Sequence, residues 1–231
     1  MKSELRLKES QITALRDGVL SGRTQRQALL DKRRLDAVER LWTAFMGLTP
    51  FVMVSGFMSA IKFDASAEEA SRNPNLRRFF STIAGNHDEK LKLLSENQAK
   101  TEQPFVSPLA WAYFYAYQTI VLSAYMRAKM LEIGLEKPSK LFNEEGVKNL
   151  LKAALPRQSE YIDQWGASGY YYLLEELEKN LFAELQKMLR GEDEDQASIK
   201  QAARIMDLAH KAAANLQQQS PEVVQAEIRA E

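Results

Sequence analysis

Two long stretches of this sequence contain no acidic or basic side chain, and they limit what the chain can fold into. The first covers residues 41–61 and the second covers residues 103–126. About twenty uncharged, mostly apolar residues form either a helix inside a protein core or a helix that spans a membrane. The other residues within the two stretches help to decide between these alternatives.

The residues within the two stretches favour a protein core over lipid. Pro50 interrupts the first stretch, because a proline inside a helix removes a backbone hydrogen bond and bends the chain. Tyrosines occur within the second stretch, whereas membrane helices concentrate tyrosine at the two interfaces. They are Tyr113, Tyr115, Tyr117 and Tyr125. We therefore expect buried core helices. The alternatives are a membrane hairpin formed by residues 41–61 and 103–126, and segments that become buried only on assembly.

The clearest amphipathic helix follows Tyr170. Apolar residues recur there every third or fourth position, while charged side chains take the opposite face. The apolar positions are Leu173, Leu177, Leu181, Leu185 and Met188 or Leu189. A helix with one apolar stripe must bury it against something. We expect Leu177 and Leu181 to face either a partner protein or the core of the chain itself.

Residues 1–45 are predicted to form a basic, partly coiled-coil helical arm. Apolar residues recur there at helical spacing, and the stripe around Ile12 is a candidate interaction surface. The stripe consists of Leu5, Ile12, Leu15 and Val19. Ser21 and Gly22 are expected to interrupt this helix, and Thr24 is expected to cap a second one.

Proline, glycine and asparagine residues mark the ends of the other expected helices. Helices are predicted near residues 65–72, 74–84, 89–100 and 107–133. Gly134 followed by Pro138 is a typical helix end. Asn143 is expected to cap a further helix that Pro156 terminates, and a short helix follows around Tyr161 and Trp165. A last helix is predicted to present Ile199, Ala203, Met206, Ala213 and Leu216 on one face.

These patterns predict an all-α protein, since no segment alternates apolar and polar residues over the length that a β-strand requires. The expected organisation is a helical bundle with an arm at its N-terminal end and an amphipathic C-terminal helix. Its parts are the arm 1–45, the bundle 46–190, an acidic linker 191–196, the C-terminal helix 197–218 and a flexible tail 219–231.

The charge of the chain is balanced overall but not along its length. The 31 basic and 31 acidic residues cancel, which argues against nucleic-acid binding, because that requires a cationic excess. Residues 1–40 carry ten basic and six acidic side chains, a net +4, whereas residues 175–231 carry seven and twelve, a net −5. This asymmetry favours head-to-tail contact between subunits or an arm that binds an anionic surface.

The sequence contains few residues that carry chemistry. It has no cysteine, which excludes disulfides, thiolate metal sites and cysteine nucleophiles. His87 lies in a polar Gly-Asn-His turn, and His210 follows Asp207 by three residues, a spacing that some helical metal sites use. Neither histidine has further ligands at matching positions. Tyr125 and Lys129 have the spacing of a dehydrogenase pair, but no glycine-rich nucleotide loop precedes them.

We accordingly expect a non-enzymatic interaction or scaffold protein with no catalytic residue, metal, cofactor or small-molecule substrate. The expected partner is a second copy of the chain or a larger protein complex. The aromatic residues around Trp111 and Tyr170 are expected to form core or a partner-facing patch. The first residues lack the apolar stretch of a secretory signal, so we expect a cytoplasmic protein. The alternative function is that of a membrane-associated protein built on the hairpin of residues 41–61 and 103–126.

Overall fold

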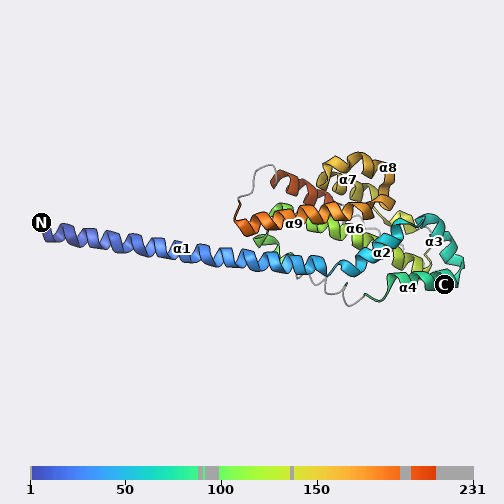
Figure 1. The fold of residues 1–231 in the computed structure, drawn as a ribbon, viewed down its shortest axis with the longest axis horizontal. Helices are drawn as coiled ribbons and strands as arrows, with labels where there is room; N and C mark the ends of the chain where they lie inside the picture. Colours follow the sequence, from blue (N-terminus) through green and yellow to red (C-terminus); the bar gives the residue numbers. More distant parts are fainter. Residues whose placement is uncertain (1, 88–90, 92–98, 136–137, 193–198, 212–231) are drawn as a thin grey trace.

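The described part of the chain is mainly helical, as expected for an all-α protein (Figure 1). The computed structural model describes residues 2–87, 91, 99–135, 138–192 and 199–211, without the side chains of residues 2–20, 139 and 140. Short 3-10 turns join the α-helices, and no β-strand occurs in these ranges.

A single helix, α1 (Lys2–Met46), forms the N-terminal part of the chain. The break predicted at Ser21 and Gly22 is wrong: the helix passes through both residues. One glycine costs a helix only about 1 kcal/mol, which long helical segments on both sides can offset. The N-terminal part of α1 projects beyond the rest of the molecule (Figure 1), whereas Leu41 and Phe45 are buried. The core therefore includes residues of α1 that precede residue 46.

The central helix is α6 (Pro108–Ile133), which confirms the helix predicted over residues 107–133. It packs against α2 (Thr49–Ser59), α4 (Pro74–Ala84) and α9 (Leu174–Arg190). Because helices cover it on several sides, most of its side chains are buried, and all of these buried side chains are uncharged. The Ser107 hydroxyl begins the helix by accepting a hydrogen bond of 3.0 Å from the Ala110 N–H.

No single helix among the described residues is both long and apolar enough to cross a membrane. Taken together, the helical segments Ser21–Met46 and Thr49–Ser59 are long and apolar enough for such a span, but the chain bends by 42° between them.

Shorter helices complete the bundle near the positions that the sequence predicts. They are α3 (Phe63–Arg72), α7 (Glu144–Ala154) and α8 (Ser159–Gly169), with the 3-10 turns η1 (Ala99–Phe105), η2 (Pro138–Leu141), η3 (Pro156–Gln158) and η4 (Tyr170–Leu173). Asn143 caps α7 as predicted, because its Oδ1 accepts a 2.9 Å hydrogen bond from the Gly146 N–H. The helix expected over residues 89–100 falls mostly outside the described residues, and residues 99 and 100 belong to η1.

The leucine stripe of α9 is buried inside the chain's own core. Leu177 and Leu181 are both 0% exposed, and α9 packs along α6. Of the two alternatives for these leucines, a partner or the chain's own core, the structure therefore shows the core. The α-helix also begins later than predicted, at Leu174, because η4 forms the first turn after Tyr170.

The last described helix covers residues 199–211, and its buried face differs from the predicted one. Ala202, Ile205 and Ala209 are buried, whereas Ile199 and Ala203 are exposed. The packing therefore selects a stripe shifted by about one residue from the one we predicted. The predicted positions Ala213 and Leu216, the tail 219–231 and most of the linker 191–196 lie outside the described residues.

Gly134 ends α6 in a left-handed conformation, with φ 74°. A Cβ at this position would lie 2.8 Å from Cδ of Arg77. We expect Gly134→Ala to lower the free energy of unfolding by about 1–2 kcal/mol from the left-handed backbone alone, plus the cost of displacing Arg77. Urea unfolding measures this loss. Gly191→Ala is the matched control, because Gly191 has φ 70° but no atom within 4 Å of its added Cβ. Equal losses in the two variants would show that Arg77 is displaced at no cost.

Candidate functional site

A buried carboxylate fixes α1 against the rest of the molecule. Glu102 in η1 is 1% exposed, and its oxygens lie 2.5 Å from Nη1 of Arg33 and 3.3 Å from Nη1 of Arg40. The Thr101 hydroxyl donates a further hydrogen bond to it, at 3.1 Å. The guanidinium carbon of Arg33 also lies 4.1 Å from the centroid of the Phe105 ring. These contacts hold the direction of α1 where it leaves the body.

The same contacts keep Glu102 ionised. Burial on its own would raise the pKa of this carboxyl. The hydrogen bonds from Arg33 and then Thr101, together with the charges of Arg33 and Arg40, outweigh burial, so the pKa of Glu102 lies below its ordinary value. Sequence reasoning did not find this group, because Glu102 and Arg33 are 69 positions apart.

On the N-terminal side of Arg33, α1 presents apolar side chains to solvent. We name residues 21–30 the projecting segment; almost all of its side chains are exposed, including Leu29 at 62% and Leu30 at 50%. Arg23 and Arg26 are its only charged residues, so its net charge is +2. Leu30 precedes the buried Ala37 by seven residues and therefore lies on the same face of the helix. The face that α1 buries against the body thus continues outward without cover from the described residues.

A second apolar surface lies along the line where α1 and α9 meet. The two helices run antiparallel (Figure 1), and the ring centroids of Trp42 and Phe182 are 5.6 Å apart. Leu35 precedes Trp42 by seven residues, and Leu189 follows Phe182 by seven, so antiparallel packing brings these two leucines to the same level. Leu35, Phe182 and Leu189 are each about half exposed. We name Leu35, Trp42, Phe182 and Leu189 the seam.

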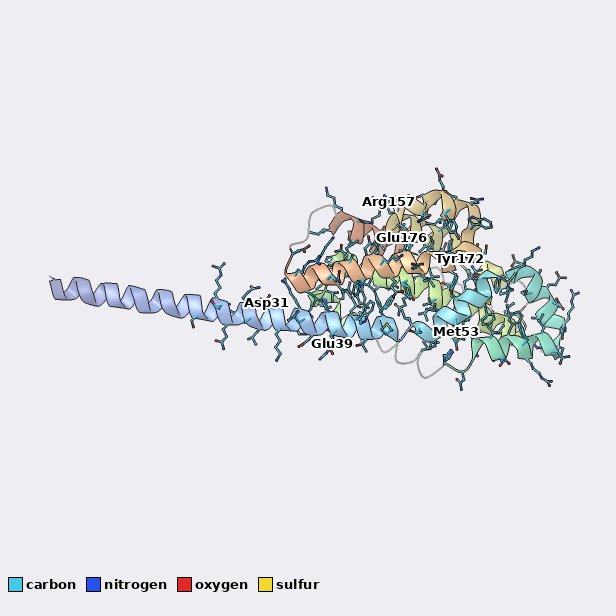
Figure 2. All side chains as sticks on the ribbon, in the orientation of Figure 1. Asp31, Glu39, Met53, Arg157, Tyr172 and Glu176 are labelled. Carbon is cyan, nitrogen blue, oxygen red and sulfur yellow. The ribbon has the colours of Figure 1, made fainter. Side chains whose placement is uncertain are left out.

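Acidic side chains outnumber basic ones along the border of the seam, where Lys32 and Lys179 lie three residues before Leu35 and Phe182. Asp31 and Glu39 lie four residues before and after Leu35, and Glu178 lies four residues before Phe182. Residues four apart share a helix face, so all three carboxylates flank the apolar side chains. All three are exposed. Figure 2 shows Asp31 and Glu39 along the stretch of α1 that runs beside the end of α9.

A pocket of about 440 Å³ opens on another part of the molecule, between α2, α6, α7 and α8. Its walls are mostly apolar and include Met58, Ile61, Phe63, Ile120, Phe142 and Val147. Trp165 and Tyr170 line it as well, and so do the polar side chains of Lys62 and Arg127. Gly166 interrupts α8 at the pocket with φ 52°, a conformation that favours glycine.

Arg127 is the most tightly held polar group of this pocket. Its Nη2 lies 2.7 Å from Oε1 of Glu144, and its guanidinium carbon lies 4.6 Å and 5.0 Å from the ring centroids of Phe142 and Phe63. Such contacts between a cation and aromatic rings fix the guanidinium in place. Burial, followed by the charge of Glu144, raises the pKa of the nearby Tyr170 hydroxyl to about 12, so this hydroxyl remains protonated.

Of the residues that the sequence singled out for chemistry, His87 and Tyr125 lie together, with ring centroids 6.2 Å apart, but no third such residue joins them among the described contacts. The His87 ring packs on Phe51, with centroids 5.5 Å apart, while the His210 ring lies 6.3 Å from that of Tyr115. Asp207 pairs with Lys211 at 2.6 Å rather than with a metal-binding partner. In the part of the chain that the structure describes, no group of three or more His, Asp or Glu residues could hold a metal ion.

Some of the remaining residues that the sequence singled out are buried, and others are exposed. Tyr125 is buried, and Lys129 pairs with Glu132 at 2.6 Å. The aromatic residues of α6 are mainly core, whereas Trp165 and Tyr172 are more than half exposed. The side chain of Ile12 lies outside the described residues.

Three comparisons with known proteins give no further identification. Neither a family model, nor a curated protein, nor a solved structure matches this chain.

Proposed function

We propose that this chain is a non-enzymatic assembly protein that self-associates, with the projecting segment of one copy resting on the seam of a second copy. The exposure of Leu29 and Leu30 on the outward part of α1 carries this proposal. A helix without tertiary packing is only marginally stable in water. Covering apolar surface gains about 25 cal/mol per Å². The projecting segment therefore gains helical stability and buries its leucines when a partner covers it.

Charge complementarity selects a second copy as that partner. The projecting segment carries Arg23 and Arg26 and no acidic residue, a net +2. The border of the seam has more acidic than basic side chains, a net −1 from Asp31, Glu39 and Glu178 against Lys32 and Lys179. An apolar surface of net charge +2 thus meets an apolar surface whose border has a net charge of −1. Complementary charges of this kind speed association and disfavour wrong partners. Glu178 is the one of these carboxylates that belongs to the acidic C-terminal part of the sequence.

The position of the two surfaces supports a two-fold dimer. The projecting segment and the α1 half of the seam follow each other directly on one helix. An antiparallel arrangement of two α1 helices therefore places each projecting segment on the other copy's seam. Each contact is then made twice, as in a closed dimer with two-fold symmetry.

Placing two lysines in the seam tests this proposal. We expect the double variant Leu35→Lys, Leu189→Lys to be a monomer, because its lysines repel Arg23 and Arg26. Light scattering on a size-exclusion column should then give 26.3 kDa. Ile133→Lys is the control, since Ile133 is a 64% exposed apolar residue at the end of α6, outside the seam. A double variant with the same mass as the wild type would refute the proposal.

A charge reversal on the projecting segment tests whether the contact is direct. Adding Arg23→Glu and Arg26→Glu to the lysine variant places acidic groups opposite basic ones. We expect this fourfold variant to regain part of the association that the lysine variant loses. High salt should weaken the regained association, because exposed charges are screened.

A further inference from the structure

We propose that the pocket between α2, α6, α7 and α8 binds an amphipathic small molecule with one carboxylate. The apolar walls would hold the hydrocarbon part, while Arg127 and Lys62 would bind the carboxylate. This inference is independent of self-association, because no residue of the seam or the projecting segment lines the pocket.

The size and composition of the pocket fit a small ligand rather than a protein segment. Its volume of about 440 Å³ lies within the roughly 300–1,000 Å³ that is typical of small-molecule sites. Such sites combine mainly hydrophobic walls with a few well-placed polar groups. Met58, Ile61, Ile120 and Val147 provide the hydrophobic surface here.

The charges at the pocket favour an anion. Arg127 and Lys62 contribute two positive charges against the one negative charge of Glu144, which leaves a net +1. Glu144 engages Nη2 of Arg127, whereas a guanidinium has five N–H donors. Lys62 has no ion pair with any residue that the structure describes. Both cations can therefore bind a carboxylate.

The rigidity of Arg127 favours recognition of a planar anion. The guanidinium carbon lies over the rings of Phe63 and Phe142, and Glu144 binds the guanidinium at Nη2. A guanidinium that is fixed before binding loses little entropy when it pairs with a carboxylate. A neutral head group of the same size lacks the attraction between opposite charges, and a cationic head group is repelled.

Fluorescence titration tests the proposal, because Trp165 forms part of the pocket wall. The probes are decanoate, decanol and decylamine, each below its micelle concentration. We expect a saturable change in tryptophan emission with decanoate, with affinity falling from decanoate to decanol to decylamine. The Trp165→Phe variant should lose the signal, although Trp42 and Trp111 remain.

Two substitutions assign the binding to the cations. Arg127→Gln should weaken decanoate binding roughly ten- to a hundredfold, since it removes a charge-assisted hydrogen bond, and leave decanol binding nearly unchanged. Lys62→Gln should have a smaller effect in the same direction. Lys62→Gln is expected to fold because Lys62 is exposed, so this variant still tests the proposal if Arg127→Gln fails to fold. Arg157→Gln is the matched control, since Arg157 is exposed and does not line the pocket.

Three results would overturn the inference. The first is the absence of any saturable emission change with decanoate. The second is equal affinity for decanoate and decanol, which would make the pocket a site without charge preference. The third is decanoate binding that is undiminished both in a folded Arg127→Gln variant and in the Lys62→Gln variant.

Discussion

Replacing Leu177 and Leu181 together by alanine is expected to unfold the protein rather than to dissociate it. Both leucines are 0% exposed in the contact between α9 and α6. A buried leucine replaced by alanine costs about 2–5 kcal/mol, through lost burial and the cavity that remains. Two such losses are comparable with the total stability of a domain, about 5–15 kcal/mol. Circular dichroism should therefore show a large loss of helix.

An exposed apolar residue provides the control for this prediction. Ile133→Ala removes a side chain of similar volume that is 64% exposed, so its effect should stay within about 0.5 kcal/mol. Native helix content in the double alanine variant, combined with a lower molar mass, would contradict our account. That result would place Leu177 and Leu181 in a contact between subunits.

Replacing Glu102 by alanine is expected to weaken the attachment of α1 and to make stability less dependent on pH. The substitution removes the acceptor for Arg33, Arg40 and Thr101, and it should cost about 1–3 kcal/mol of unfolding free energy at neutral pH. Glu102→Gln should cost less, because its amide oxygen still accepts a hydrogen bond. Glu68→Ala is the control for an exposed pair, with an expected effect of about 0–1 kcal/mol.

The pH dependence follows from the lowered pKa of Glu102. A carboxyl group with a lower pKa in the folded state stabilises the fold above the unfolded-state pKa, about 4.3 for glutamate. This contribution is lost as the pH falls through the folded-state pKa. The difference in urea midpoint between wild type and Glu102→Ala should therefore shrink between neutral pH and about pH 3. A difference that stays constant over this range would show that the Glu102 charge does not stabilise the fold.

The parts of the fold that the sequence predicted are those with local signals. The end of α6 follows from Gly134 and Pro138, and α7 begins at Asn143 and ends before Pro156. These residues act through their own backbone preferences and need no knowledge of distant neighbours. The all-α class follows in the same way from helical spacing without alternating segments.

The wrong and the undecided predictions concern features that distant parts of the chain determine. Whether Leu177 faces a partner or the core depends on α6, which lies far away in the sequence and covers it. The local sequence at Gly22 predicts a helix break, but α1 continues through this residue. In the helix over residues 199–211, contacts select the face containing Ile205, although Ile199 and Met206 form an equally regular pattern.

The candidate sites were hidden from sequence reasoning for the same reason. The pocket combines residues from four helices, and Lys62 and Arg127 have no fixed spacing that would mark a binding motif. The seam arises only because α1 and α9 pack antiparallel, which brings Trp42 against Phe182. Sequence periodicity identifies the apolar face of a helix but not the helix that covers it.

The molar mass of the wild-type protein in solution tests the central claim of self-association most directly. Light scattering on a size-exclusion column, at increasing protein concentration and in moderate salt, measures it. The account predicts twice 26.3 kDa, with a shift towards 26.3 kDa on dilution or at high salt. A mass of 26.3 kDa at every concentration would contradict it.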